Sequence, residues 1–210
     1  TGIAMSDLVD SYRPSLAWQQ LARPIAVLPI GACEQHGPHL PLATDALEAT
    51  YFGRELAREL AAALLPTIPL LTSYEHSGFR GTLSLRPETA AAMLRDLVDE
   101  LEQQHFTRLV VLNAHGGNFI LKPIVRDINR QDRPIKLLLM DFWTYDGSEE
   151  GRELGAGEIH AGAWETSLML VIHPELVGDY RAVESPKKLA AQQSDLTHVG
   201  VGVISPAGPW

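Results

Sequence analysis

The sequence is short of cysteine, of basic residues and of long apolar runs. Cys33 is its only cysteine, which excludes an internal disulfide framework and suits a reducing compartment. No stretch approaches the ~20 apolar residues that a bilayer span requires, and no basic-then-apolar signal segment opens the chain. Its 17 Lys and Arg against 26 Asp and Glu give a net charge of −9. We therefore expect a cytoplasmic protein without nucleic-acid or membrane partners.

Two well-known active-site motifs are also missing. The sequence has no Gly-x-Ser-x-Gly elbow, so it lacks the nucleophile of a serine esterase, although His115-Gly116-Gly117 is like an oxyanion-hole loop. The stretch "GAGEIHAG" does not have the Gly-x-Gly-x-x-Gly spacing of a dinucleotide-binding turn. A small-molecule-binding module without catalytic activity remains an alternative to an enzyme.

Apolar runs alternate with helix-forming segments along the chain. The patterns predict strands at 25–30, 67–73, 108–113 and 135–143, and helices at 7–14, 45–65, 87–105, 116–130 and 163–172. Strands separated by helices at this spacing favour βαβ crossovers, a mostly parallel sheet and helices on both of its faces. No repeat or linker divides the 210 residues, so the predicted fold class is α/β in a single domain, 1–210.

Polar side chains gather at the predicted strand ends. Glu34 and His36 follow the first of these strands, His115 follows "RLVVLN", and His160 and Glu165 flank the start of the last helix. Open α/β sheets bind ligands beyond the carboxyl ends of their strands, so these segments are expected to meet at one rim.

The types of these side chains favour a metal site. In an extended segment Glu34 and His36 point the same way, and Asp45 can return to them after the Pro-rich loop "GPHLPL". Carboxylates and imidazoles without thiolates suit Zn²⁺, Mn²⁺ or Fe²⁺. A carboxylate such as Asp45 can also bridge two ions, as in two-metal hydrolases.

Four blocks carry a family resemblance: "GACEQHGPHLPLATDA", "EHSGFRGTLSL", "LNAHGGN" and "HAGAWETSLML". In this order they resemble the signature blocks of the creatininase (creatinine amidohydrolase) family. The resemblance implies a three-layer α/β/α sandwich, two divalent metal ions per subunit and a homo-oligomer, commonly a hexamer. Members of that family hydrolyse creatinine, formylaminopyrimidine nucleotides or the tail of a mycofactocin precursor peptide.

The resemblance also implies roles for individual residues. His160 corresponds to the catalytic histidine, and Glu165 is either a ligand or the group that orients His160. Four residues correspond to metal ligands, with the third bridging: Glu34, His36, Asp45 and His115.

This chain departs from creatininase at Gly117, where creatininase has a further ligand carboxylate. Glu165 is the expected substitute, and the departure makes creatinine a doubtful substrate. The C-terminal region is shorter than in typical members, so it is expected either to be truncated or to shape the pocket differently.

The activity so implied is that of a metal-dependent amidohydrolase. A hydroxide bridging two metals would attack a small cyclic amide or formamide-type substrate, and His160 would protonate the leaving nitrogen. Ser77, Gly78 and Phe79 are expected to line the substrate pocket, and Trp143 either stacks on a substrate ring or packs in the core. A peptide tail, a cyclic ketone and a non-catalytic binding role are the alternatives.

Simpler interpretations of the same residues remain open. The segment from Glu34 to Asp45 could be a solvated loop, and His115 could cap a helix or belong to a turn that cradles a phosphate. Glu165 could be an ordinary first-turn residue. Cys33 is expected to be a small buried residue rather than a nucleophile, because no paired base is specified. His39 and His76 lie in the motif blocks but are not assigned as ligands.

Overall fold

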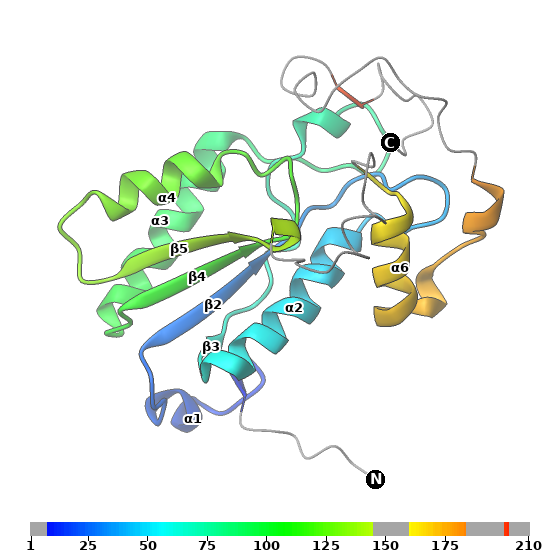
Figure 1. The fold of residues 1–210 in the computed structure, drawn as a ribbon. Coiled ribbons are helices and arrows are strands. Elements are labelled where there is room, and N and C mark those ends of the chain that lie inside the picture. The colour runs from blue at the N-terminus through cyan, green and yellow to red at the C-terminus, as the bar shows by residue number, and fades with distance from the viewer. Residues whose placement is uncertain (1–7, 145–159, 184–199, 202–210) are drawn as a thin grey trace, which may run out of the picture.

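The computed structural model describes residues 8–144, 160–183 and 200–201, and every statement below concerns these residues (Figure 1). A sheet of five parallel strands lies at the centre, in the order β1-β3-β2-β4-β5. Its strands are β1 (Val9–Asp10), β2 (Ile25–Ile30), β3 (Ala63–Leu64), β4 (Arg108–Asn113) and β5 (Lys136–Asp141).

The three long strands run in register for their whole length. Ile25 is level with Arg108 and Lys136 at the amino end, and Ile30 is level with Asn113 and Asp141 at the carboxyl end. Because these strands are parallel, the loops that leave their carboxyl ends all emerge at the same edge of the sheet.

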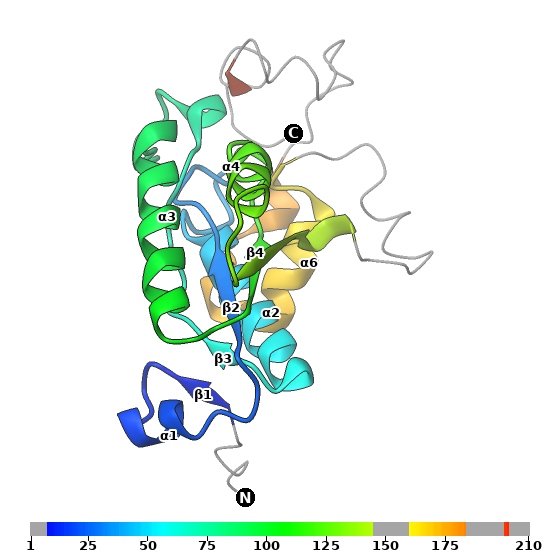
Figure 2. The same cartoon turned by 90° about the vertical axis from the view of Figure 1, so that its left-hand side faces the viewer.

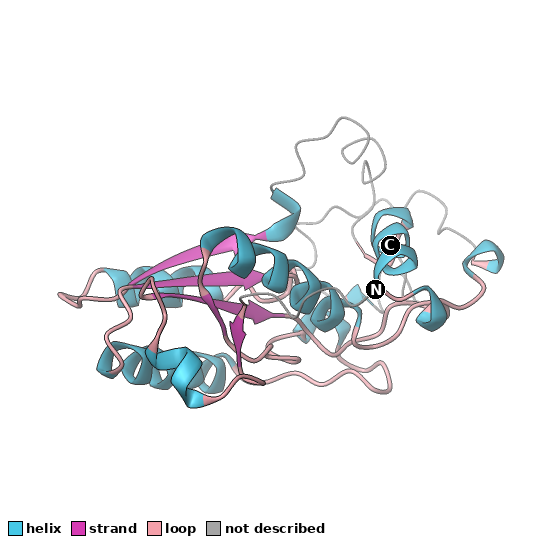
Figure 3. Ribbon diagram, turned by 90° about the horizontal axis from the view of Figure 1, so that it is seen from below, coloured by secondary structure: helices cyan, strands magenta, loops and turns pink. Residues whose placement is uncertain are grey.

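Helices cover both faces of the sheet, as Figures 2 and 3 show. Alternate residues of β2 point to opposite faces. Leu28 packs in the core cluster that includes α3 (Pro87–Gln103) and α4 (Leu121–Asn129). Val27 packs in a second cluster with α2 (Thr44–Leu60), against which α6 (Ala163–Ile172) lies. The predicted α/β fold with helices on both faces of a parallel sheet is confirmed.

The remaining short elements lie in the connections. Helix α1 comprises Ser15–Gln19, and the 3-10 helices are η1 (Tyr74–His76), η2 (Phe142–Thr144), η3 (Pro174–Leu176) and η4 (Tyr180–Ala182). No helix among the described residues is both long and apolar enough to cross a membrane.

Four predicted elements differ from the structure. The helix expected at 45–65 ends at Leu60, because Ala61 turns into the left-handed region (φ 49°) and the next residues enter the sheet as β3. The segment expected as a strand at 67–73 makes only one bridge to β2, from Ile68 to Ile30. The helix expected at 7–14 is wrong within its described part, where Val9–Asp10 forms β1 and the helix starts after Pro14. The helix expected at 116–130 begins only at Leu121, because the residues after Gly116 form a turn.

The alanine-rich segment that follows α2 explains the first two errors. Ala62 and Ala63 are good helix formers, but they are 2% and 0% exposed and pack against the sheet. This short buried segment takes the position in the sheet between β1 and β2, so the following apolar residues run on as a connection. Tertiary packing overrides local propensity here.

Candidate active site

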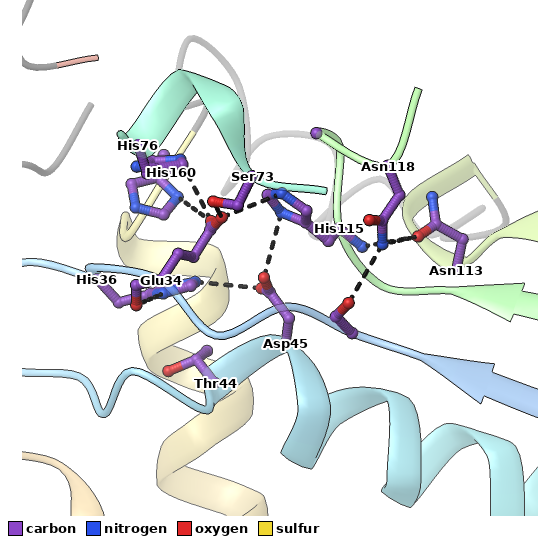
Figure 4. Close-up of polar contacts among 12 residues, drawn as sticks. Glu34, His36, Thr44, Asp45, Ser73, His76, Asn113, His115, Asn118 and His160 are labelled. Carbon is purple, nitrogen blue, oxygen red and sulfur yellow. Dashed lines mark hydrogen bonds and ion pairs between the residues drawn. The ribbon is translucent and has the colours of Figure 1, made fainter. Parts of the chain in front are cut away.

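The predicted site residues converge at the carboxyl edge of the sheet (Figure 4). The loop from β2 to α2 provides Glu34 and His36, and the first turn of α2 provides Asp45. His115 comes from the loop after β4, and His160 precedes α6. These five side chains are all 7% exposed or less. The interpretation of the first segment as a solvated loop is therefore wrong.

Asp45 lies between two of the histidines. Its Oδ1 is 3.1 Å from Nε2 of His36, and its Oδ2 is 3.2 Å from Nδ1 of His115. The two oxygens of one carboxylate thus face two different imidazoles, which is the arrangement expected of a bridging ligand.

The close approach of α2 to the end of β2 places Asp45 there. A Cβ on Gly31 would lie 2.4 Å from the backbone nitrogen of Ala46 and 2.6 Å from the carbonyl carbon of Asp45. Only glycine leaves room for the helix backbone at this distance. Gly31 therefore fixes the first turn of α2 against the strand that leads to Glu34.

Asn118 ties three loops of the site together. Its side-chain amide donates to the carbonyl of Gly31 at 3.2 Å and to Oδ1 of Asn113 at 3.0 Å. Its Oδ1 accepts from the backbone N–H of Thr72 at 3.1 Å. Asn113 Oδ1 also accepts from the N–H of His115 at 3.2 Å, so the network fixes the backbone that carries this histidine.

Glu34 occupies the centre of the site and is fully buried. Its Oε2 lies 3.0 Å from Nε2 of His115 and accepts a hydrogen bond from the Ser73 hydroxyl. Its Oε1 lies 3.2 Å from Nε2 of His76. Burial raises the pKa of Glu34 to about 8, although His115 acts in the opposite direction. The positive charge that the protein places near this carboxylate is therefore too small to stabilise its ionised form in the buried site.

The charges around Asp45 act in the opposite sense. Burial disfavours its ionised form, yet His36 and His115 hold the pKa of Asp45 below its usual range. Burial likewise disfavours the charged form of His36, but Asp45 and Glu165 outweigh it and raise that pKa to about 10. Asp45 is thus an anion shared by the two neighbouring imidazoles.

His160 faces the site with one particular nitrogen. Its Nε2 lies 2.6 Å from the backbone carbonyl of Gln35, and because a carbonyl can only accept, Nε2 carries the hydrogen. Nδ1 is then unprotonated and lies 3.7 Å from Oε1 of Glu34. Burial, followed by the charges of His36 and His76, lowers the pKa of His160 well below its usual value. His160 is therefore a neutral imidazole with a free lone pair toward Glu34.

Glu165 lies on the His36 side of the site. Its Oε1 is 3.8 Å from Nε2 of His36, and its Oε2 accepts a hydrogen bond from the backbone N–H of Ala161. Burial raises the pKa of Glu165. The carboxylate thus holds the backbone next to His160 and also reaches the group around Asp45.

The side chains present fit divalent cations. Oε1 of Glu34, Oδ2 of Asp45 and Nε2 of His115 are buried without a hydrogen bond of good geometry. Within the described part of the chain, the ion pairs of these carboxylates are with histidines and none is with Lys or Arg. Two of the groups of side chains that could hold an ion contain Asp45. These groups are Glu34-Asp45-His115 and His36-Asp45-Glu165. Buried carboxylates with so little countercharge favour metal binding.

Gln35, Glu75 and His76 also reach the site, although the sequence did not mark them as ligands. Gln35 accepts from the N–H of Gly37 at 3.0 Å through Oε1, so its amide donates to Nδ1 of His76 at 2.9 Å. The pKa of His76 falls to about 4, chiefly through burial, so this imidazole is neutral. Glu75 lies 2.9 Å from His115. Glu75 and His76 both lie in the block "EHSGFRGTLSL", but nothing in the sequence of this block distinguishes a ligand from an ordinary loop residue.

The residues expected to bind substrate lie around the rim. Ser77 and Gly78 are exposed, and Phe79 is half-buried, directly after η1. Trp143 is 38% exposed and its ring contacts Phe142 edge-on, with the centroids 5.7 Å apart. Trp143 is therefore outside the core. His39 bonds Thr166 of α6 at 2.9 Å through Nε2, which is a structural contact.

Comparison with known proteins identifies the family. The model of the family described as creatininase, creatinine amidohydrolase, matches residues 13–210. The chain is 34% identical over 196 residues to the mycofactocin precursor peptide peptidase of Mycobacterium ulcerans, covering 88% of this chain and 73% of the relative. It is 31% identical over 198 residues to creatinine amidohydrolase of Pseudomonas putida, covering 81% and 75%.

A solved structure agrees with this assignment. The crystal structure of a creatinine amidohydrolase (creatininase) superimposes with a TM-score of 0.78 at 25% identity, covering 97% of this chain and 87% of that chain. Family model, sequence relatives and fold coincide over most of the described residues. The chain belongs to the creatininase family.

Proposed function

We propose that this protein is a dinuclear metal-dependent amidohydrolase that cleaves a carbon–nitrogen bond in a small cyclic amide or formamide-type substrate. The observation that supports this most is the position of Asp45, with one oxygen toward His36 and the other toward His115. Oxygen and nitrogen ligands of this kind suit Zn²⁺, Mn²⁺ or Fe²⁺. The named activities of the two relatives, a peptidase and an amidohydrolase, agree with hydrolysis at carbon–nitrogen bonds.

The proposed metal ligands are Glu34, His36, Asp45, His115 and Glu165. Two divalent ions held by them would acidify a water molecule and polarise the substrate carbonyl. The protein's own part is to fix the ligands, which Gly31 and Asn118 do through the contacts described above.

His160 is the proposed proton carrier. Its Nδ1 lone pair faces the site because Nε2 donates to the carbonyl of Gln35. Nδ1 can accept a proton from the attacking water and pass it to the leaving nitrogen. Since amide nitrogen is a poor leaving group, a positioned acid of this kind typically contributes about 10²–10⁴-fold in rate. Glu165 supports it by holding the N–H of Ala161.

Substrate would enter past the rim. The exposed backbone of Ser77 and Gly78 can donate hydrogen bonds to polar ring atoms, and Phe79 and Trp143 offer aromatic surface. The peptidase relative supports a second candidate substrate, the tail of a short peptide. Both candidates place a planar amide at the same proton carrier.

Metal analysis combined with a substrate panel tests the proposal. We expect two ions per subunit in the purified protein, loss of activity on chelation, and recovery with Zn²⁺, Mn²⁺ or Fe²⁺. The panel contains cyclic amides, formamides and short peptides, with release of ammonia, amine or amino acid as the signal. Two bound ions without hydrolysis of any member would contradict the amidohydrolase assignment, and retained activity after metal removal would contradict the metal dependence.

A variant of His160 tests the proton-carrier role. His160→Ala should lower kcat by about 10²–10⁴-fold and leave two ions bound, because the carrier assists the leaving group without holding metal. His173→Ala is the control, since this histidine is half-exposed and its side chain pairs with Glu175 on the surface, away from the site. Loss of both metals in His160→Ala would contradict the assigned role.

The oligomeric state is a separate part of the proposal. By resemblance to its family, the protein is expected to form a homo-oligomer, and specifically a hexamer. Light scattering on the eluted protein measures the mass directly, and a monomer would contradict this expectation.

A further inference from the structure

Glu75 is a buried carboxylate for which the proposed function has no use. It belongs to η1, between Ser73 and His76, and its side chain is 10% exposed. Oε1 lies 2.9 Å from Nε2 of His115, and neither atom has a hydrogen bond of good geometry within the described part of the chain. Two polar atoms are thus buried at contact distance without satisfying each other.

The room for this carboxylate is provided by Gly117. A Cβ at position 117 would lie 1.6 Å from Oε1 of Glu75 and 2.3 Å from Nε2 of His115. Gly117 is not in the left-handed region, so its backbone does not demand glycine. Its neighbour Gly116 has open space where a Cβ would go. Because residue 117 has no side chain, the Glu75 carboxylate can occupy the space beside it.

Carboxylate oxygens from two other segments lie close to Nε2 of His115. Nε2 of His115 lies 3.0 Å from Oε2 of Glu34 and 2.9 Å from Oε1 of Glu75. Ligands about 2.0–2.2 Å from a tetrahedral ion are separated by roughly 3.3 Å. These two distances are close to that separation, and Glu75 also forms, with Glu34 and His76, a group whose ligand atoms all lie within 4.8 Å of one another.

We propose that Glu75 is a metal-binding carboxylate of this site, admitted beside His115 because Gly117 has no side chain. The inference rests on the proposed function in so far as it requires a metal centre at this rim. It changes the expectation that Glu165 alone replaces the carboxylate missing at position 117. Glu165 lies beside His36, whereas Glu75 fills the space next to residue 117.

Metal affinity of the full chain measures this role directly. Glu75→Gln keeps the shape of the side chain and removes its charge. With Zn²⁺ titrated against a chromogenic chelator, we expect the dissociation constant of one ion to rise at least about 10-fold while the other ion is held as before. With Co²⁺ as the probe, the visible absorption should change in intensity because a ligand is lost. Glu88→Gln, an exposed glutamate in the first turn of α3, is the matched control.

A second pair of variants approaches the site from the glycine. Gly117→Ala must displace the ends of Glu75 and His115, so it should weaken Zn²⁺ binding at least about 10-fold while thermal unfolding stays cooperative. Gly116→Ala should leave the affinity unchanged, because nothing lies where its Cβ would be.

The outcomes separate this inference from the proposed function. If the unaltered protein binds fewer than two ions, the dinuclear centre itself is contradicted. If it binds two and Glu75→Gln keeps both affinities and the Co²⁺ spectrum, Glu75 is not a ligand and the inference is overturned, whatever happens to kcat. Full Zn²⁺ affinity in Gly117→Ala would overturn it as well.

Discussion

The two helical layers of this fold are packed with different side chains. On one face, α3 and α4 bury large apolar residues, among them Leu94, Val98 and Ile128, each 1% exposed or less. On the other face, the buried positions of α2 are small or polar: Thr44, Asp45, Ala46, Glu48, Ala49, Gly53 and Ala57. Area buried is the main source of stability, so the first layer contributes more to it.

The small residues of α2 allow this helix to lie close to the sheet. A Cβ on Gly53 would lie 2.4 Å from the Pro29 ring, and one on Gly31 would meet the backbone of Ala46 at 2.4 Å. The helix therefore lies close against β2 along its length, and its first turn reaches the site. One layer thus mainly holds the fold together, while the other brings charged side chains to the proposed metal site.

Substitution of Asp45, in the α2 layer, should have the largest effect on metal binding and activity. Asp45→Asn removes the charge that His36 and His115 share, so we expect loss of at least one ion and a fall in kcat/KM of at least about 10³-fold, or ~4 kcal/mol. Metal content and activity are measured together. Asp96→Asn, at an exposed position of α3, is the control. Unchanged metal content in Asp45→Asn would remove the basis of the proposed centre.

A core substitution in the other layer should have the reverse signature. Leu94 is 1% exposed in the α3–α4 cluster, so Leu94→Ala should lower the free energy of unfolding by about 2–5 kcal/mol. Below its unfolding temperature the variant should bind two ions as before. Leu16→Ala, at a 59% exposed position, should change stability by no more than about 0.5 kcal/mol. The two layers would not be separable in function if Leu94→Ala lost metal while remaining folded.

The sequence predicted the α3–α4 side better than the α2 side. Pro87 and the periodic apolar residues predicted the start and the buried face of α3 correctly, because large apolar side chains mark that face in the sequence. The end of α2 was wrong because alanine suits a helix and a buried strand alike, and only the packing of Ala62 and Ala63 decides. Patterns of residue size and polarity carry less information where small residues pack closely.

The same contrast applies to the site. Glu34, His36 and His115 were selected from their place after strands. Asp45, His160 and Glu165 were selected from helix starts and from the family blocks, and the structure brings all six together. Glu75 and His76 belong to a loop without a strand of its own, so no periodicity marks them. The space beside Gly117 depends on which side chain enters from another segment, and a linear sequence does not specify that contact.

Substitution of Glu48 should have the smallest effect of these variants, in contrast to substitution of Asp45 in the same helix. Glu48 lies three residues after Asp45, is fully buried, and neither of its oxygens has a hydrogen bond within the described residues. Burial, followed by the charges of Glu165 and Asp45, raises the pKa of Glu48 well above its usual value, so the folded protein keeps it neutral. Gln has nearly the same shape and is also neutral. Glu48→Gln should therefore retain two ions and activity within about twofold of the unaltered protein.

The pH dependence of stability distinguishes this carboxyl from that of Asp45. With its pKa raised on folding, Glu48 stabilises the folded state only below its ordinary pKa, and that contribution is lost as pH rises toward the folded value. Gln does not titrate, so chemical unfolding of the metal-free proteins should show Glu48→Gln gaining stability relative to the unaltered chain from pH 5 to pH 8. A difference that stays constant or shrinks over this range would mean that Glu48 is ionised in the fold. The N-terminal part of α2 would then carry two charges to the site instead of one.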